Sequence, residues 1–421
     1  MHTDNLPDYQ TFELLIGAPA AAGYPVTVTQ SPAGEATAHC RLDPTDGELG
    51  DALAAVRTQN TDFAFLSQVG AFLFDELFAG EIGSLYRTSL GIVRSQGQRL
   101  RIRLRIEPPE LASLPWELLF DPQEEAALAL AGETALVRHV PLRLPVRPTS
   151  VEPPLRILLV IAHPSDAPTL DVAKEQQLIV DALAEQTAQK RIVLQVLAEA
   201  TVAAISQALR AFQPHVFHFI GHGYFHDEQA YALLEDEAGR GHLVDAAAFQ
   251  ALFADARATR LAILNACQTA ATSDQRPLVG LAPSLLQRQL SAVVAMQQAI
   301  TDEAAAVFAR DFYRSLALGY PVDAAVAEAR RAIYLEVGQD APDWVAPVLF
   351  LRAQDGQLFQ IEEAKTPPAA AVPPPAPTQP PPIDTFVGRE AELAFYAGQI
   401  AQNGIAVIAG MAGVGKTSLA A

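Results

Sequence analysis

Two reactive side chains, a histidine and a cysteine, each follow an apolar run. His222 comes after HVFHFIG, and Cys267 comes after LAILNA, 45 residues later. A cysteine thiol is mostly protonated at neutral pH, so a nucleophilic cysteine needs a base that takes its proton and later delivers it to a leaving amine. A histidine can do both. The pair therefore indicates nucleophilic attack on a carbonyl group.

Glycines stand on both sides of the histidine, in the sequence Gly221-His222-Gly223. Glycine allows a chain to turn sharply where it leaves a strand. It also leaves the backbone N–H of Gly223 uncovered, where it can face a developing oxyanion. Together with the backbone N–H of Cys267, this group would form a two-donor oxyanion hole. Gly223 is therefore a candidate catalytic residue through its backbone.

The neighbouring histidines have other interpretations. Strand periodicity places His218 on the face of Val216 and Ile220, so we expect a core histidine that is satisfied by a backbone carbonyl. His215 begins the strand on the opposite face. His226 lies in a loop, where it lines the cleft or is simply solvated. Because alternate residues of a strand point to opposite faces and no carboxylate cluster completes a ligand set, we expect no zinc site here.

The elements that must position these residues lie between residues 155 and 351, where apolar strand patterns alternate with helix patterns. We expect a hairpin around 232–244 and two long helices near 302–318 and 321–337. Apolar strands separated by helices predict a mostly parallel sheet that is covered on both faces, which is an α/β/α sandwich. In such sheets, catalytic groups gather outside the carboxyl ends of the strands, where His222 and Cys267 are predicted to lie.

The first part of the chain is read as an α+β flank that packs on this sandwich and carries no chemistry. Within it, LRIRLRI (100–106) alternates apolar residues with arginine and predicts a strand with one solvated face. The segment LASLPWELLFDP (111–122) predicts a short helix that docks a tryptophan. Cys40 has no base in its surroundings and is interpreted as a small half-buried residue.

A proline-rich run divides the chain, with nine of its 31 prolines between residues 366 and 382. It predicts an extended linker. After it, a strand is expected at 405–409, and GMAGVGKT fits the phosphate-loop pattern GxxxxGK[ST]. The candidate nucleotide-binding residues are Gly410, Gly413, Gly415, Lys416 and Thr417. The predicted domains are 1–95 (flank), 96–352 (sandwich), 353–383 (linker) and 384–421 (the truncated start of a nucleotide-binding domain, expected to bind nucleotide weakly or not at all).

Composition narrows the choice of partners. The formal net charge of −19 argues against a role on nucleic acid or on an anionic membrane. No segment predicts export or a membrane span. Two cysteines are too few for a disulfide framework, and a cytoplasmic location is expected.

The blocks HFIGHGYF, LNACQTA, AVVAMQQAITDEAAAVFARDFYRSL and PVDAAVAEARRAI resemble the CHAT domain, a branch of the caspase and separase clan of cysteine peptidases. The resemblance covers about residues 96–352. It implies a caspase-like fold and a cysteine endopeptidase that needs no cofactor and cleaves a protein substrate with a dyad of His222 and Cys267. Asp302 and Asp227, with the adjacent Glu228 and Glu303, are candidates for binding a basic substrate residue, although an acidic loop is also simply solvated.

The segment FVGREAEL (386–393) together with the phosphate loop resembles the opening of a STAND-type NTPase of the NB-ARC and NACHT group. That resemblance implies ATP and Mg²⁺ as ligands of the complete domain, and nucleotide-dependent oligomerisation of the full-length protein in signalling or defence. Two further hypotheses stay open. The caspase-like part could be a non-catalytic interaction module, or Cys267 could be a redox sensor that works without His222.

Overall fold

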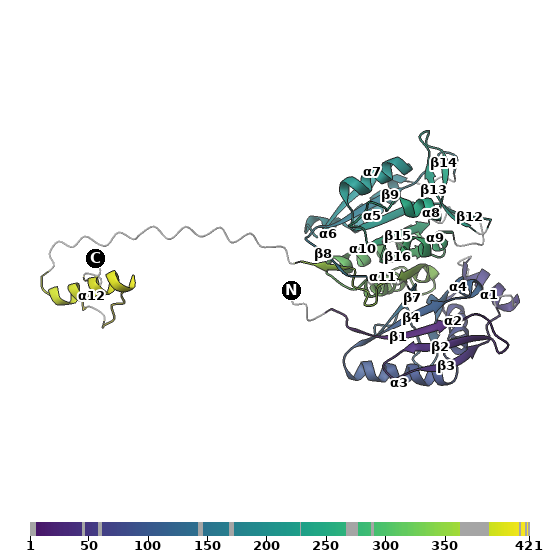
Figure 1. Cartoon of the computed structure of the whole chain (residues 1–421), viewed down its shortest axis with the longest axis horizontal. Coiled ribbons are helices and arrows are strands. Elements are labelled where there is room, and N and C mark those ends of the chain that lie inside the picture. Colours follow the sequence, from purple (N-terminus) through teal and green to yellow (C-terminus); the bar gives the residue numbers. More distant parts are fainter. Residues whose placement is uncertain are drawn as a thin grey trace. The chain divides into compact units, whose positions relative to one another are not determined.

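A computed structural model describes the chain in two compact units, Met1–Glu363 and Ala364–Ala421 (Figure 1). The description leaves out the following residues: 1–5, 44–46, 58–60, 142–145, 168–171, 228, 267–276, 288–289, 363–386, 412–413, 417–418 and 420–421.

The centre of the first unit is a sheet in which the described residues form eleven strands. In spatial order these are β10 (Ile192–Leu197), β9 (Leu155–Ile161), β11 (Val216–Gly221), β15 (Leu261–Ala266), β16 (Ala292–Met296), β17 (Pro347–Leu351), β7 (Thr134–His139), β4 (Arg99–Ile106), β1 (Tyr9–Ile16), β2 (Tyr24–Gln30) and β3 (Ala36–Cys40).

Strand direction divides this sheet into two parallel groups. The five strands from β10 to β16 are parallel, and so are the four strands from β17 to β1. The groups meet at the antiparallel pair β16 and β17, and β2 and β3 add two more antiparallel pairings at one edge. The prediction of an α/β fold with a large, mostly parallel sheet is confirmed.

Helices pack on both faces of the sheet. Along β11, Val216 and Ile220 belong to one apolar cluster, while Phe217 and Phe219 belong to another. This alternation shows that both faces are buried, as expected for parallel strands joined by helical crossovers. The helices are α1 (Gly47–Arg57), α2 (Phe63–Leu77), α3 (Glu81–Ser95), α4 (Pro109–Ala112), α5 (Val172–Ala182), α6 (Ala184–Ala188), α7 (Val202–Phe212), α8 (Ala246–Ala251), α9 (Pro277–Leu286), α10 (Asp302–Ala317) and α11 (Val322–Glu336), with the short 3₁₀ turns η2 (Trp116–Leu118) and η4 (Pro342–Val345).

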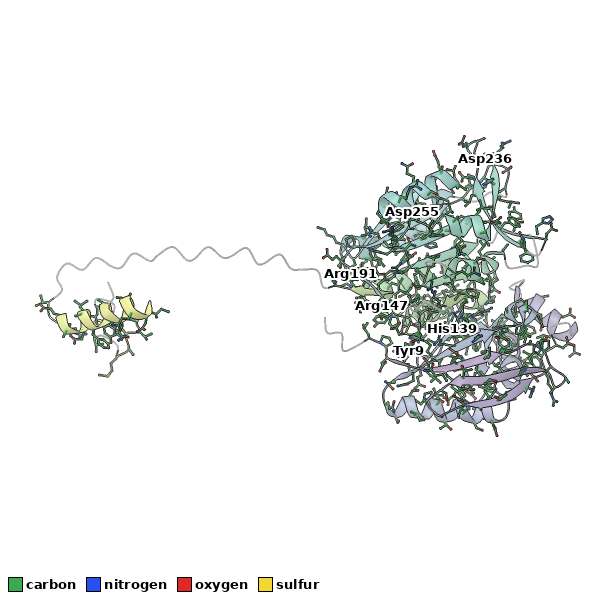
Figure 2. All side chains as sticks on the ribbon, viewed as in Figure 1. Tyr9, His139, Arg147, Arg191, Asp236 and Asp255 are labelled. Carbon is green, nitrogen blue, oxygen red and sulfur yellow. The ribbon has the colours of Figure 1, made fainter. Side chains whose placement is uncertain are left out.

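Three small sheets complete the unit. β12 (Gly223–His226), β13 (Gln229–Glu235) and β14 (Gly241–Asp245) form an antiparallel meander directly after His222. The hairpin expected around 232–244 is therefore present, and Figure 2 shows Asp236 at its tip. The other two sheets are the pair β8 (Thr149–Val151) with β18 (Phe359–Ile361) and the pair β5 (Phe120–Asp121) with β6 (Ala126–Ala127).

The N-terminal part does not pack on the sheet as a separate flank, because its strands continue the sheet. β4 pairs with β7 on one side and with β1 on the other. The expectation of a distinct flank was wrong. A strand at the edge of a sheet has unpaired backbone N–H and C=O groups, and here the N-terminal strands pair with such an edge and extend the sheet. Trp116 is fully buried, and its Nε1 donates to the Leu111 carbonyl oxygen at 2.8 Å, which confirms the predicted docking of a tryptophan.

The two central arginines of β4 are buried, contrary to the expectation of a solvated face. Arg101 is 3 % exposed and donates to Asp323 Oδ2 at 2.5 Å, and Arg103 is 4 % exposed with Glu13 Oε2 at 3.3 Å. Their other contacts include Tyr9 and His139, which are labelled in Figure 2. Alternation of apolar and charged residues shows that a strand has two different faces, but not that the charged face is exposed. Here carboxylates from other elements pair with the arginines, so the charged face can be buried.

The second unit contains the helix α12 (Glu390–Asn403). No side chain of this helix is buried. Residues 405–409 form no strand, and Ile405 and Val407 are exposed. The expectation of a strand there was wrong because this unit, as far as it is described, offers no second strand to complete a ladder.

No single helix among the described residues has both the length and the apolarity to cross a bilayer, and α2 and α3 meet that condition only as a pair bent by 105°.

Candidate active site

In the sequence, the two residues of the predicted dyad directly follow the carboxyl ends of two neighbouring strands. β11 and β15 run parallel, and their register pairs Gly221 with Ala266, the last residue of each strand. His222 follows the first strand directly, and Cys267 is the next residue in the sequence after the second. Cys267 itself lies outside the described residues. The strand ends that precede the two predicted residues are thus side by side.

His222 is 2 % exposed and joins the large sheet to the meander. It lies between β11 and β12, and its carbonyl oxygen accepts a hydrogen bond from the Leu233 N–H at 3.0 Å. The backbone on both sides of His222 therefore belongs to a strand. This fixes the position from which its imidazole leaves the chain.

Gly221 is required by a close approach. A Cβ at this position would lie 2.7 Å from the Phe219 ring and 3.2 Å from the Ala162 Cβ. Its φ is not positive, so the sharp turn expected from its glycine backbone is not what it provides. A methyl group here would push β11 away from its surroundings just before His222.

The backbone N–H of Gly223 points away from the meander. Leu233 bonds to His222, so these two residues form a hydrogen-bonded pair of the antiparallel ladder. The next pair is Gly223 with Ala232. In such ladders, hydrogen-bonded pairs alternate with pairs whose N–H groups point outward. Gly223 therefore directs its N–H away from β13, as an oxyanion donor would require.

The other histidines of this region differ in their surroundings. His218 is buried as expected, but its Nδ1 contacts the Tyr313 hydroxyl at 3.0 Å and not a backbone carbonyl. Burial lowers the pKa of His218 to about 3. His215 is also buried, and its Nδ1 accepts from the Arg156 N–H at 3.0 Å. His226 is exposed, with Asp227 Oδ2 at 3.3 Å from its Nε2.

The two acidic candidates for substrate binding have separate partners. Asp302 is the first residue of α10 and forms an ion pair with Lys174 of α5; its side chain is 41 % exposed. Asp227 is 84 % exposed beside His226. Glu228 lies outside the described residues. An oxygen of Asp302 thus already binds an ammonium group.

Several buried polar residues near these strand ends were not expected from the sequence. The Glu117 carboxylate binds Arg138 and the side chain of Gln297, which follows β16. Asn265, two residues before Cys267 in the sequence, is buried, and its Oδ1 has no hydrogen-bond partner among the residues that the structure describes. The available signal was a charged residue inside an apolar run, as in PWELLF and ALVRHV. That pattern identifies a buried charge but not its partner.

Only part of the phosphate loop can be compared with a nucleotide site. Lys416 Nζ donates to the carbonyl oxygens of Gly410 at 2.8 Å and Met411 at 2.7 Å, and Gly415 has a φ of 82°. Gly413 and Thr417 lie outside the described residues. An ammonium group has three N–H donors and two of them are used here, so nucleotide binding by this segment stays a prediction. Across the described part of the chain, no group of three or more His, Cys, Asp or Glu side chains could hold a metal ion.

Solved structures with a detectable similarity include peptidases. The Saccharomyces cerevisiae separase in complex with securin is 13 % identical over 72 % of this chain, with a TM-score of 0.38, and this chain spans 22 % of it. The Arg-specific cysteine proteinase gingipain R is 11 % identical over 73 % of this chain and 75 % of its own, with a TM-score of 0.39. The Drosophila initiator caspase Dronc is 9 % identical over 52 % of this chain and 97 % of its own, with a TM-score of 0.30.

Among curated proteins, no sequence matches this chain. The family model described as "CHAT domain" matches residues 73–352. This segment is more than half of the sequence, and the chain therefore belongs to the CHAT domain family.

Proposed function

We propose that this protein is a cysteine endopeptidase of the caspase-like type, with His222 and Cys267 as its dyad. The observation that carries the proposal is the register of β11 and β15, whose paired ends Gly221 and Ala266 directly precede the two residues. Sequence neighbours of paired strand ends leave the sheet at the same edge. Membership of the CHAT domain family agrees with this chemistry.

The reaction would proceed in two stages. His222 takes the proton from the Cys267 thiol, the sulfur bonds to the peptide carbonyl carbon, and the oxygen becomes negative. The N–H of Gly223 donates to this oxygen, together with that of Cys267. The C–N bond then breaks, the amine leaves with the proton from His222, and a thioester remains. Water, deprotonated by His222, hydrolyses the thioester and restores the thiol.

An active-site probe tests the dyad. A tetrapeptidyl acyloxymethyl ketone with arginine next to the reactive group should label the wild-type protein and should fail with Cys267→Ala. His222→Ala should slow labelling by about 10² to 10⁴-fold, the usual contribution of a general acid–base group. Labelling would be followed by intact-protein mass spectrometry.

Cys40 supplies a matched control, because it is the other cysteine of the chain. It is fully buried, and burial raises the pKa of its thiol to about 11. Cys40→Ala should therefore label like the wild type. Absence of labelling in the wild type would refute the peptidase and favour a non-catalytic interaction module. Labelling of Cys267 that is unchanged in His222→Ala would instead favour a redox sensor.

We also propose that Asp302, assisted by Asp227, favours a basic substrate residue before the scissile bond. The support is that both carboxylates are accessible to solvent and that Asp302 begins α10, in the chain segment that follows β16. A probe with arginine next to the reactive group should then react faster than the same probe with glutamate. Equal rates, or a preference for glutamate, would contradict this assignment.

Regulation is a separate part of the proposal. The support for a phosphate loop is the sequence spacing of Gly410, Gly415 and Lys416. We infer that this segment belongs to a STAND-type domain that binds ATP and Mg²⁺ and controls the peptidase through oligomerisation. Sedimentation of the natural full-length protein with and without ATP tests this, and an unchanged oligomeric state would contradict it.

A further inference from the structure

A fully buried ion pair lies under the segment that follows β16. Both carboxylate oxygens of Glu117 accept hydrogen bonds from Arg138, at 3.1 Å from Nε and 2.6 Å from Nη2. Their side chains are 1 % and 4 % exposed. Arg138 also donates to the carbonyl oxygens of Ala112 and Leu114, at 2.6 and 2.9 Å. The guanidinium is thus held from several directions, and it holds the carboxylate in one orientation.

This ion pair fixes the side chain of Gln297. The Gln297 amide donates to Glu117 Oε2 at 3.0 Å and to the Val345 carbonyl oxygen at 2.7 Å, which uses both of its N–H groups. Its backbone N–H donates to the Ala346 carbonyl oxygen at 2.8 Å. Gln297 is 4 % exposed. Its main chain and its side chain are therefore both fixed.

The rest of the segment 297–301 is tied to η4. Gln298 Nε2 donates to the Pro342 carbonyl oxygen at 3.0 Å, and the Thr301 N–H donates to Asp343 Oδ1 at 2.7 Å. Asp343 is itself 1 % exposed. The segment is thus fixed at its beginning by Glu117 and along its length by η4. Asp302 and α10 follow directly.

The register of the sheet places this segment beside the strand end that precedes the predicted nucleophile in the sequence. β15 and β16 are parallel neighbours, and their last recorded pair is Leu264 with Ala295. Continuing that register puts Gln297 level with Ala266, the residue before Cys267. Three adjacent parallel strands, β11, β15 and β16, therefore end at one edge of the sheet, and His222, Cys267 and Gln297 are the residues that follow them in the sequence.

We propose that Glu117 is a positioning residue of the peptidase: through Arg138 and Gln297 it fixes segment 297–301 as the wall against which the substrate lies beside Cys267. The inference rests on the proposed peptidase function. Desolvation offsets most of the attraction in a buried ion pair, so such a pair adds little net stability over apolar residues of the same size. What it supplies here is a defined geometry for Gln297.

The test separates substrate binding from thiol chemistry. In Glu117→Gln, the arginine-bearing acyloxymethyl ketone probe should bind about tenfold more weakly, because segment 297–301 is displaced. The limiting rate of inactivation should stay within about twofold of the wild type, because the thiol chemistry is unchanged. Alkylation of Cys267 by iodoacetamide, which uses no wall, should keep its wild-type rate. A purely structural defect would lower all three together.

A second buried arginine–carboxylate pair is the control. Arg101 binds Asp323 at 2.5 Å, and it also binds the backbone of residues 354 and 355. Residues 354 and 355 come after Leu351, which pairs with Ala292, the first residue of β16. Gln297, in contrast, comes after Met296, the last residue of β16. The pair thus lies beyond the opposite end of β16 and β17. Asp323→Asn should be destabilised in a similar way and yet bind the probe like the wild type.

Each outcome decides between the proposals. Weaker probe binding in Glu117→Gln but not in Asp323→Asn supports the inference. Equal effects in both variants, or wild-type probe binding in Glu117→Gln, overturn it. If Glu117→Gln does not fold, Gln297→Leu removes the same link from the other side and should give the same weakening. A wild-type protein that never reacts with the probe refutes the peptidase itself, and this result is distinct from a failure of the wall.

Discussion

At the scale of single residues, burial decides the chemistry of His218. This histidine is only four positions before His222, yet its Nδ1 faces the Tyr313 hydroxyl, and its Nε2 is buried with no hydrogen-bond partner in the described part of the chain. Burial lowers its pKa to about 3, so the ring is neutral at physiological pH. A neutral, enclosed ring cannot exchange protons with a substrate. Its expected effect is on stability.

The stability of the protein should depend on pH through His218. Its folded pKa of about 3 is below the ordinary value of 6.5, so below pH 6.5 the unfolded chain binds the proton more readily than the folded protein. The neutral ring makes its full contribution to the free energy of unfolding above pH 6.5. This contribution is lost as the pH falls toward 3, and about 2 kcal/mol of it is lost between pH 6.5 and 5.

Urea denaturation of the first unit at pH 7.5 and pH 5 measures this effect. His218→Gln keeps a neutral partner for Tyr313 and should lose about 2 kcal/mol less than the wild type between the two pH values. His226→Gln is the control, because that side chain is 77 % exposed. Equal pH dependence in His218→Gln and the wild type would show that this ring is not the cause.

At the scale of the secondary-structure element, β4 shows how a strand with charged residues can be central. Its arginines reach carboxylates on β1 and α11, and β7 and β1 cover its two edges. Arg105, near the end of the same strand, has a side chain that is 37 % exposed and pairs with Glu107 at 3.2 Å. The same residue type thus has two environments within one strand.

Substitution of these two arginines should have very different costs. Arg101→Ala leaves the Asp323 carboxylate buried without its partner and should lower the free energy of unfolding by about 3 to 5 kcal/mol. Arg105→Ala removes a surface pair and should cost about 1 kcal/mol or less. Chemical denaturation of both variants measures the difference. Similar costs would show that the buried pair is not the main contribution of Arg101.

At the scale of the whole molecule, the first unit contains both apolar clusters. The members of the two clusters all lie between Phe12 and Ile361. The helix α12 of the second unit buries none of its residues. Each unit is compact by itself. The first unit should therefore fold without the second.

Truncation after Glu363 tests this independence. The shortened protein should unfold within about 2 °C of the full 421-residue chain, because it loses no part of either apolar cluster. It should also react with the active-site probe at the same rate. Calorimetry and labelling on both lengths measure these quantities, and a Tm lower by about 5 °C or more would show that the first unit depends on the second.

The sequence allowed the local elements to be predicted well. Apolar runs and helical periodicity placed β11, β15, α10 and α11 close to their observed bounds. These signals are local, because the period of a strand or a helix is written in consecutive residues. The positions of His222 and Cys267 directly after two apolar strands could be predicted for the same reason. Their roles stay a prediction.

The sequence by itself therefore determined that this is an α/β protein with a histidine and a cysteine after separate buried strands. The tertiary structure decided the rest: that the N-terminal strands continue the same sheet, that Arg101 and Arg103 are buried, and that Glu117 meets Arg138 and Gln297. The physical reason is range. A local pattern fixes how a residue sits relative to its own strand or helix, whereas the partner of a buried charge comes from an element whose place is fixed only when the sheet is assembled.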